Sequence, residues 1–121
     1  MTEVYDVRTI GFIAGTVPVP ITATVPSMMV GVIFHAKYAL GGQTGTVTAY
    51  LAQRRAGTIT GTLDVVTLTP NVPTYPLIGE GRLDSIVAVV DPGHEVVAFT
   101  STGSVIGRIL FGYAYGRTRQ P

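Results

Sequence analysis

Three side chains that could act together in chemistry lie within one short stretch, Asp91-Pro92-Gly93-His94-Glu95. A histidine between two carboxylates can bind a metal ion, or it can act as a general base that a neighbouring acid orients. The same stretch is also typical of a tight turn, with proline second, glycine third and an aspartate that hydrogen-bonds its own backbone. We favour the turn and expect neither a metal site nor a catalytic site here.

The other residues that could support catalysis are spread along the chain. They are the acids Glu3, Asp6, Asp64, Glu80 and Asp84 and the second histidine, His35. A lone histidine in an apolar run is more often a hydrogen-bonded structural residue than a ligand. The four serines lack the setting of a nucleophile elbow, and the glycines form no phosphate-binding loop that leads into a helix. We therefore expect no enzyme and no cofactor.

A few basic and aromatic side chains could instead contact a partner. Arginines occur in two clusters, at 54–55 and at 117–119, and Tyr75 lies in a proline-bearing stretch where no strand needs it for packing. Arginine can pair with phosphate or an acidic surface, and tyrosine can stack on a sugar. The simpler interpretation of the arginines is that they are solvated turn residues. The candidate interaction residues are Arg54, Arg55, Tyr75, Arg117 and Arg119.

The composition limits the classes of partner. Of 121 residues, 46% are hydrophobic and only 12% are charged, about half the usual charged fraction. The net charge of +1 provides no basic surface for nucleic acid or for an anionic membrane. So little charge leaves apolar surface to be covered, and symmetric association is the common way to cover it. We expect a homo-oligomer.

The sequence also bears on the compartment. It contains no cysteine, which excludes disulfides and thiolate chemistry. No run approaches 18 apolar residues, and the first residues carry two acids and no basic segment before an apolar run. These patterns predict neither a membrane span nor a secretory signal. We expect a chain that is made in the cytoplasm and used or assembled there.

The elements that position these residues are predicted to be strands. Residues 83–115 hold three apolar runs separated by turns at 91–94 and 101–104, which predicts a three-stranded antiparallel meander. In the last run Ile109, Phe111, Tyr113 and Tyr115 share one face. Residues 28–38 read as a central strand, and prolines make 16–26 an edge strand or an extended connection.

The remaining segments fit the same pattern. We expect a strand at 4–14 with a bend near Gly11, a hairpin connection at 39–45, a strand at 46–52, a hairpin tip at 53–57, a strand at 58–68 with a bulge at 65–66, and a crossing loop at 69–82. Residues 49–56 also have good helix propensity, but two turns of helix are marginal in a threonine-rich neighbourhood.

These predictions add up to one domain of residues 1–121. An all-β chain of this length, with seven to nine strands, no substantial helix and long proline-bearing crossings, is most simply a β-sandwich with jelly-roll topology. Residues 1–26 would supply an edge strand and an extended arm that is free to lie along a neighbour.

The end of the chain resembles a known group of proteins. Residues 89–115, a short turn with aspartate and glycine followed by VVAFTSTGSVIGRILFGYAY, resemble the small jelly-roll subunits of tailed-bacteriophage virions, especially capsid decoration (cement) and spike-base proteins. The resemblance implies a non-enzymatic virion subunit, commonly a trimer, that ties neighbouring major capsid proteins together. Such virions assemble in the host cytoplasm. A spike, collar or tail subunit and a glycan-binding β-sandwich with an exposed aromatic platform are the alternatives.

Overall fold

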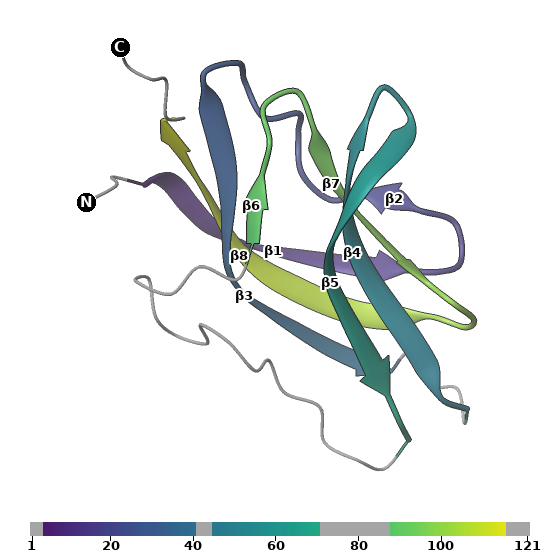
Figure 1. The fold of residues 1–121 in the computed structure, drawn as a ribbon. Helices are drawn as coiled ribbons and strands as arrows, with labels where there is room; N and C mark the ends of the chain where they lie inside the picture. Colours follow the sequence, from purple (N-terminus) through teal and green to yellow (C-terminus); the bar gives the residue numbers. More distant parts are fainter. Residues whose placement is uncertain (1–3, 41–44, 71–87, 116–121) are drawn as a thin grey trace.

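The computed structural model describes residues 4–40, 45–70 and 88–115, and in these ranges the chain is all-β. The strands are β1 (Tyr5–Ala14), β2 (Val19–Pro20), β3 (Met29–Leu40), β4 (Val47–Arg55), β5 (Thr58–Leu68), β6 (Ala88–Val90), β7 (Glu95–Thr100) and β8 (Val105–Tyr115). They form two four-stranded antiparallel sheets that pack on each other (Figure 1). The predicted β-sandwich without substantial helix is confirmed for these residues.

The strand order is that of a jelly roll. The first sheet has the order β1-β8-β3-β6 and the second sheet the order β2-β7-β4-β5. The antiparallel pairs β1–β8, β2–β7, β3–β6 and β4–β5 are those of one long hairpin that closes between β4 and β5 and then rolls up. This winding places successive strands, apart from β4 and β5, in opposite sheets, as the jelly roll requires.

The predicted meander is wrong. Strand β6 pairs with β3 in the first sheet, β7 pairs with β2 and β4 in the second, and β8 returns to the first. The turn itself is present, since the His94 N–H donates to the Asp91 carbonyl over 3.2 Å and Gly93 has φ 80°. A tight turn reverses the chain but does not decide whether the next strand pairs beside the last one or crosses to the opposite sheet. The first run was predicted to begin at residue 83, and residues 83–87 lie outside the described ranges.

Two other connections also differ from expectation. Strands β3 and β4 lie in different sheets, so residues 39–45 do not close a hairpin. Strand β4 continues through Arg55, which excludes the helix considered for 49–56 and narrows the hairpin tip to Ala56 and Gly57. Both tip residues have positive φ, 51° and 84°, as a type I′ turn demands. The predicted crossing loop at 69–82 lies almost wholly outside the described residues.

The bulges fall at positions other than those predicted. Gly11 pairs regularly with Arg108, and the irregularity of β1 lies instead at Asp6 and Val7, both opposite Gly112. In β5 the register shifts at two positions, leaving Leu63 and Thr60 as extra residues, and residues 65–66 pair regularly with β4. An extra residue in β3, Phe34, changes which side chains point inward beyond it. Bulges depend on the partner strand, which the sequence of one strand does not specify.

The core lies between the inward faces of the two sheets. Its largest members include Phe111 and Ile109 of β8, Ile33 of β3 and Leu51 of β4, all fully buried. The ring of Phe111 lies over Gly31, where an added Cβ would come within 2.8 Å of two ring carbons. The glycine is therefore required for the ring to sit at the centre of the sheet.

Residues 4–26 belong to the sandwich. Strand β1 pairs with β8 from Tyr5 to Ala14, Ile10 and Phe12 pack against the core, and Val25 is buried. The segment thus contains two edge strands, β1 in the first sheet and β2 in the second, as the edge-strand prediction proposed. Residues 5–14 are therefore not an arm that is free to lie along a neighbour. Deleting residues 2–20 would remove β1 and β2, one edge strand from each sheet, so we expect it to destabilise the fold and not merely to weaken an assembly.

We predict that Phe111→Ala lowers the free energy of unfolding by about 3 to 5 kcal/mol, because it leaves a cavity at the centre of the core. The matched control is Phe99→Ala, which removes a half-buried ring from the outer face of the second sheet and should cost less. Urea denaturation of both variants gives the comparison. Equal losses would contradict the position assigned to Phe111.

We also predict that Ala56→Gly raises the free energy of unfolding by up to about 1 kcal/mol. Alanine at φ 51° brings its Cβ close to the following carbonyl, and glycine has no Cβ. The reverse change at the neighbouring position, Gly57→Ala, should destabilise. If the two substitutions shift the denaturation midpoint in the same direction, the type I′ turn is not the conformation in solution.

Candidate functional site

The acids and the histidine at the 91–95 turn have separate structural partners. The side chain of Gln53 brackets Asp91, donating from Nε2 to its carboxylate and accepting from its backbone N–H, each over 3.0 Å. Glu95 accepts from Arg54 Nε over 2.7 Å, and His94 Nδ1 lies 3.1 Å from the Pro92 carbonyl oxygen. In the described ranges no three His, Asp or Glu side chains are placed to hold a metal ion.

The candidate interaction residues do not form one site. Arg54 is held in its ion pair with Glu95 across β4 and β7. Arg55 is exposed, and its Nε approaches Gly93, so its side chain lies over the turn. Tyr75, Arg117 and Arg119 lie outside the described residues.

His35 differs from its predicted role. It lies on β3 opposite Leu110, but its Nδ1 is buried and has no hydrogen-bond partner in the part of the chain that the structure describes. A hydrogen bond at this atom was expected of a structural histidine.

A polar contact that sequence reasoning missed joins the two sheets. Tyr38 of β3 donates its hydroxyl hydrogen to the carboxylate of Asp64 on β5 over 2.6 Å. Burial of the ring, together with the hydrogen bond to the carboxylate, raises the pKa of Tyr38 well above its ordinary value. Tyr38 therefore keeps its proton throughout the physiological range, and its hydrogen bond to Asp64 connects the two sheets.

We predict that this pair makes stability depend on alkaline pH. An unfolded tyrosine loses its proton near pH 10, whereas folded Tyr38 retains it, so the free energy of unfolding should fall as pH rises above about 10. Tyr38→Phe should reduce that fall and should cost about 1 to 3 kcal/mol at neutral pH, where Asp64 loses its donor. Urea midpoints between about pH 8 and about pH 11 test this. Tyr115→Phe, at an exposed ring, is the control, and an unchanged slope in Tyr38→Phe would refute the assignment.

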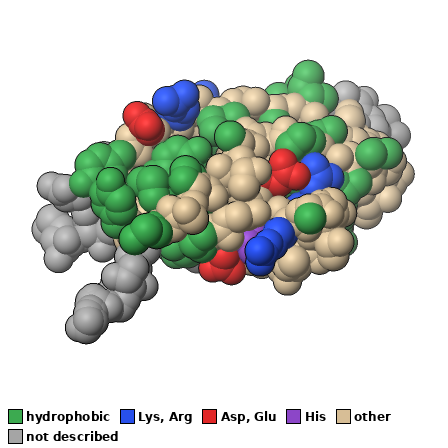
Figure 2. All heavy atoms as spheres, turned by 90° about the horizontal axis from the view of Figure 1, so that it is seen from above, with side chains coloured by type: hydrophobic (Ala, Val, Ile, Leu, Met, Phe, Trp, Pro, Cys, Tyr) green, Lys and Arg blue, Asp and Glu red, His purple; other side chains and the backbone are tan. Residues whose placement is uncertain are grey.

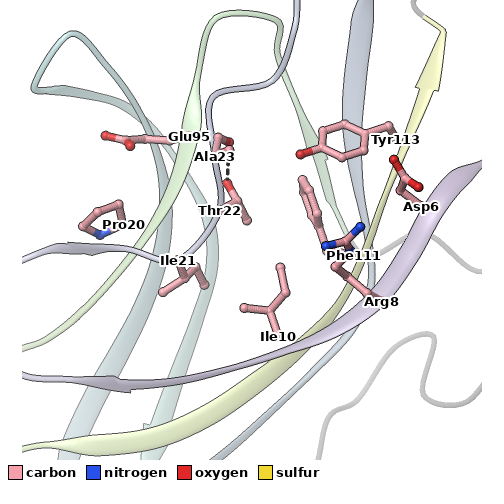
Figure 3. A pocket seen from close by; sticks show the side chains of 10 residues that line it. All are labelled: Asp6, Arg8, Ile10, Pro20, Ile21, Thr22, Ala23, Glu95, Phe111 and Tyr113. Carbon is pink, nitrogen blue, oxygen red and sulfur yellow. Dashed lines mark hydrogen bonds between the residues drawn. The ribbon is translucent and has the colours of Figure 1, made fainter.

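A groove of about 660 Å³ opens along one side of the sandwich. It is lined by Asp6, Arg8, Ile10, Pro20, Ile21, Thr22, Ala23, Glu95, Phe111 and Tyr113 (Figure 3). It exists because β1 has ten residues while β2, the facing edge strand, has only two, so the first half of β1 has no strand opposite it. Arg8 shows the result, since it pairs in register with buried Phe111 and yet is exposed.

Beside the groove, three large apolar side chains are exposed at one end of the first sheet. Tyr5 and Tyr115 pack edge to face with ring centroids 5.6 Å apart, and Tyr115 remains 65% exposed. Met28 is 67% exposed and directly precedes Met29, which pairs with Tyr115. We call Tyr5, Met28 and Tyr115 the end patch. Figure 2 shows hydrophobic side chains gathered on one part of the surface, with charged side chains beside them.

The outer faces of both sheets also expose apolar groups. On the first sheet Ile13 and Ile106 are cross-strand partners, 72% and 52% exposed. On the second sheet Tyr50 and Phe99 stack with centroids 4.8 Å apart and planes 14° apart, next to exposed Val65. Because the two rings stack on each other, each covers one face of its neighbour and leaves at most one face for a sugar. This arrangement is less suited to a glycan than an open aromatic platform.

No family model, curated protein or solved structure matches this chain. In the described ranges there is also no helix of the length and hydropathy that a membrane crossing needs. The surface is therefore the guide to function. Sequence reasoning missed the end patch because it assigned Tyr115 to packing within its strand, and the signal that could have found it is the position of Tyr115 at the very end of that strand.

Proposed function

We propose that this protein is a non-enzymatic structural subunit of a tailed-phage virion, and that it acts as a capsid decoration or cement protein. As a homotrimer it braces neighbouring major capsid proteins through surface contacts, in a virion that is assembled in the host cytoplasm. The observation that carries the proposal is the amount of apolar surface that a jelly-roll sandwich poor in charge leaves exposed.

This apolar surface is grouped. Single exposed hydrophobic side chains are ordinary, but contiguous groups usually mark sites of protein association. Here they form the end patch, the Ile13–Ile106 pair on the first sheet and the Tyr50–Phe99–Val65 row on the second. Several separate contact surfaces suit a subunit that must contact both its own copies and a larger shell.

The charged groups support a role based on contacts. Of the four acids in the described ranges, Asp64, Asp91 and Glu95 accept hydrogen bonds from side chains of neighbouring strands. Those contacts stabilise the sandwich and hold these acids away from one another. A protein that acts through surface contacts does not need these three acids for chemistry.

We predict that the purified chain sediments as a trimer at micromolar concentration and co-sediments with empty phage heads. Symmetric association buries apolar surface that would otherwise face water, and the surface left on the trimer binds the shell. Isolated tails and spikes serve as parallel targets and separate a head protein from another virion component. A monodisperse monomer that binds no phage particle would refute the proposal, and binding to a glycan array by such a monomer would favour the glycan-binding alternative.

A further inference from the structure

Two charged side chains beside the end patch have no partner among the described residues. Asp6 and Arg8 are both exposed, lie two residues apart on β1, and line the groove next to the patch (Figure 3). Neither side chain makes a hydrogen bond or an ion pair with another described residue, whereas the other described acids all do. One carboxylate and one guanidinium therefore stand unpaired at the border of an apolar surface.

The backbone is strained at the same place. Asp6 and Met28 have positive φ, 54° and 68°, a conformation that is uncommon for residues other than glycine and rare for a long side chain such as methionine. The bulge at Asp6 and Val7 sets the direction of the chain where β1 begins. Strain of this kind is retained where the surrounding structure fixes it, often at functional surfaces. Met28 is 67% exposed at this position.

We propose that the end patch, together with Asp6 and Arg8, is the surface through which copies of this chain associate with one another. An apolar centre of tyrosine and methionine with a charged border is the composition of protein interfaces. A surface that carries both an acid and a base can also complement itself, because Asp6 of one copy can pair with Arg8 of the next. This self-complementarity identifies the occupant as another copy and not the shell. The inference rests on the proposed function, in which it supplies the contact that forms the oligomer.

Charge reversal tests the pairing. Asp6→Arg places two positive groups opposite each other at every contact, and Arg8→Asp places two negative groups there, so each change should weaken self-association by about tenfold or more in sedimentation equilibrium. The double variant with both changes restores opposite charges and should associate within about threefold of the original chain. Mixing the two single variants should restore the opposite-charge pairing at contacts between unlike copies, although each variant alone associates weakly. Arg55→Asp, which makes the same change in net charge as Arg8→Asp, is the control and should associate normally.

Met28→Gly tests the apolar part without endangering the fold. Glycine suits φ 68°, so the melting temperature should not fall, while the loss of the exposed side chain should weaken association. The inference is overturned if the single reversals associate like the original chain, if the double variant is no better than either single variant, or if Met28→Gly leaves association unchanged. Binding of the original chain to empty heads is measured separately. If the original chain binds empty heads but the substitutions do not affect self-association, the further inference fails and the proposed function stands. If the original chain associates with itself as inferred but does not bind empty heads, the proposed function alone is refuted.

Discussion

The pairing of β3 with β8 is the interaction on which the rest of the sandwich depends. The two strands pair from Met29–Tyr115 to Leu40–Val105, and they form the centre of the first sheet. Strand β1 is attached only through β8, and β6 only through β3. The inward faces of these strands carry Phe111, Ile109 and Ile33, against which the second sheet packs. Loss of this pairing would divide the first sheet into two separate pairs, β1–β8 and β3–β6, and leave the second sheet without a continuous facing layer.

The edge strand β2 of the second sheet is only two residues long, and this short edge shapes the surface beside it. Proline at position 20 cannot donate to a sheet ladder, and β2 consists only of Val19 and Pro20. The chain continues beside β7 through single contacts, such as the Ile21 N–H to the Val96 carbonyl and the Val25 N–H to the His94 carbonyl. These contacts cover the core but leave the groove open beside β1. The proline that limits β2 thus also contributes to the groove beside β1.

The sequence predicted the strands well because alternation and turn chemistry are local. The segment that became β3 and the inward face of β8 follow from a period of two, and the proline-bearing edge follows from the missing N–H of proline. The pairing of strands did not follow, because a turn such as Asp91–His94 reverses the chain equally well within a sheet and between sheets. The bulges at Asp6 and Phe34 could not be placed either, since each depends on the register with a partner distant in the sequence.

The candidate site was less predictable than the fold. Ion pairs and hydrogen bonds such as Arg54–Glu95 and Tyr38–Asp64 join residues 41 and 26 positions apart, and they become visible only with the topology. The end patch gathers residues from the start of β1, the start of β3 and the end of β8. Composition indicated that apolar surface would be exposed, but only the strand order shows where.

The pairing of the first strand with the last has a consequence for synthesis. Tyr5 pairs with Tyr113, so the first residues of β1 have no partner until more than a hundred further residues, through Tyr113, have left the ribosome. Contacts between residues so far apart form slowly, because the entropy of closing the long loop is lost before the contacts are gained. Until then the apolar edge of β1, including Phe12 and Ile13, is open to strands of other nascent chains. Folding yield should therefore depend on how crowded the nascent chains are, and slower or cooler expression should favour the native sandwich over aggregates.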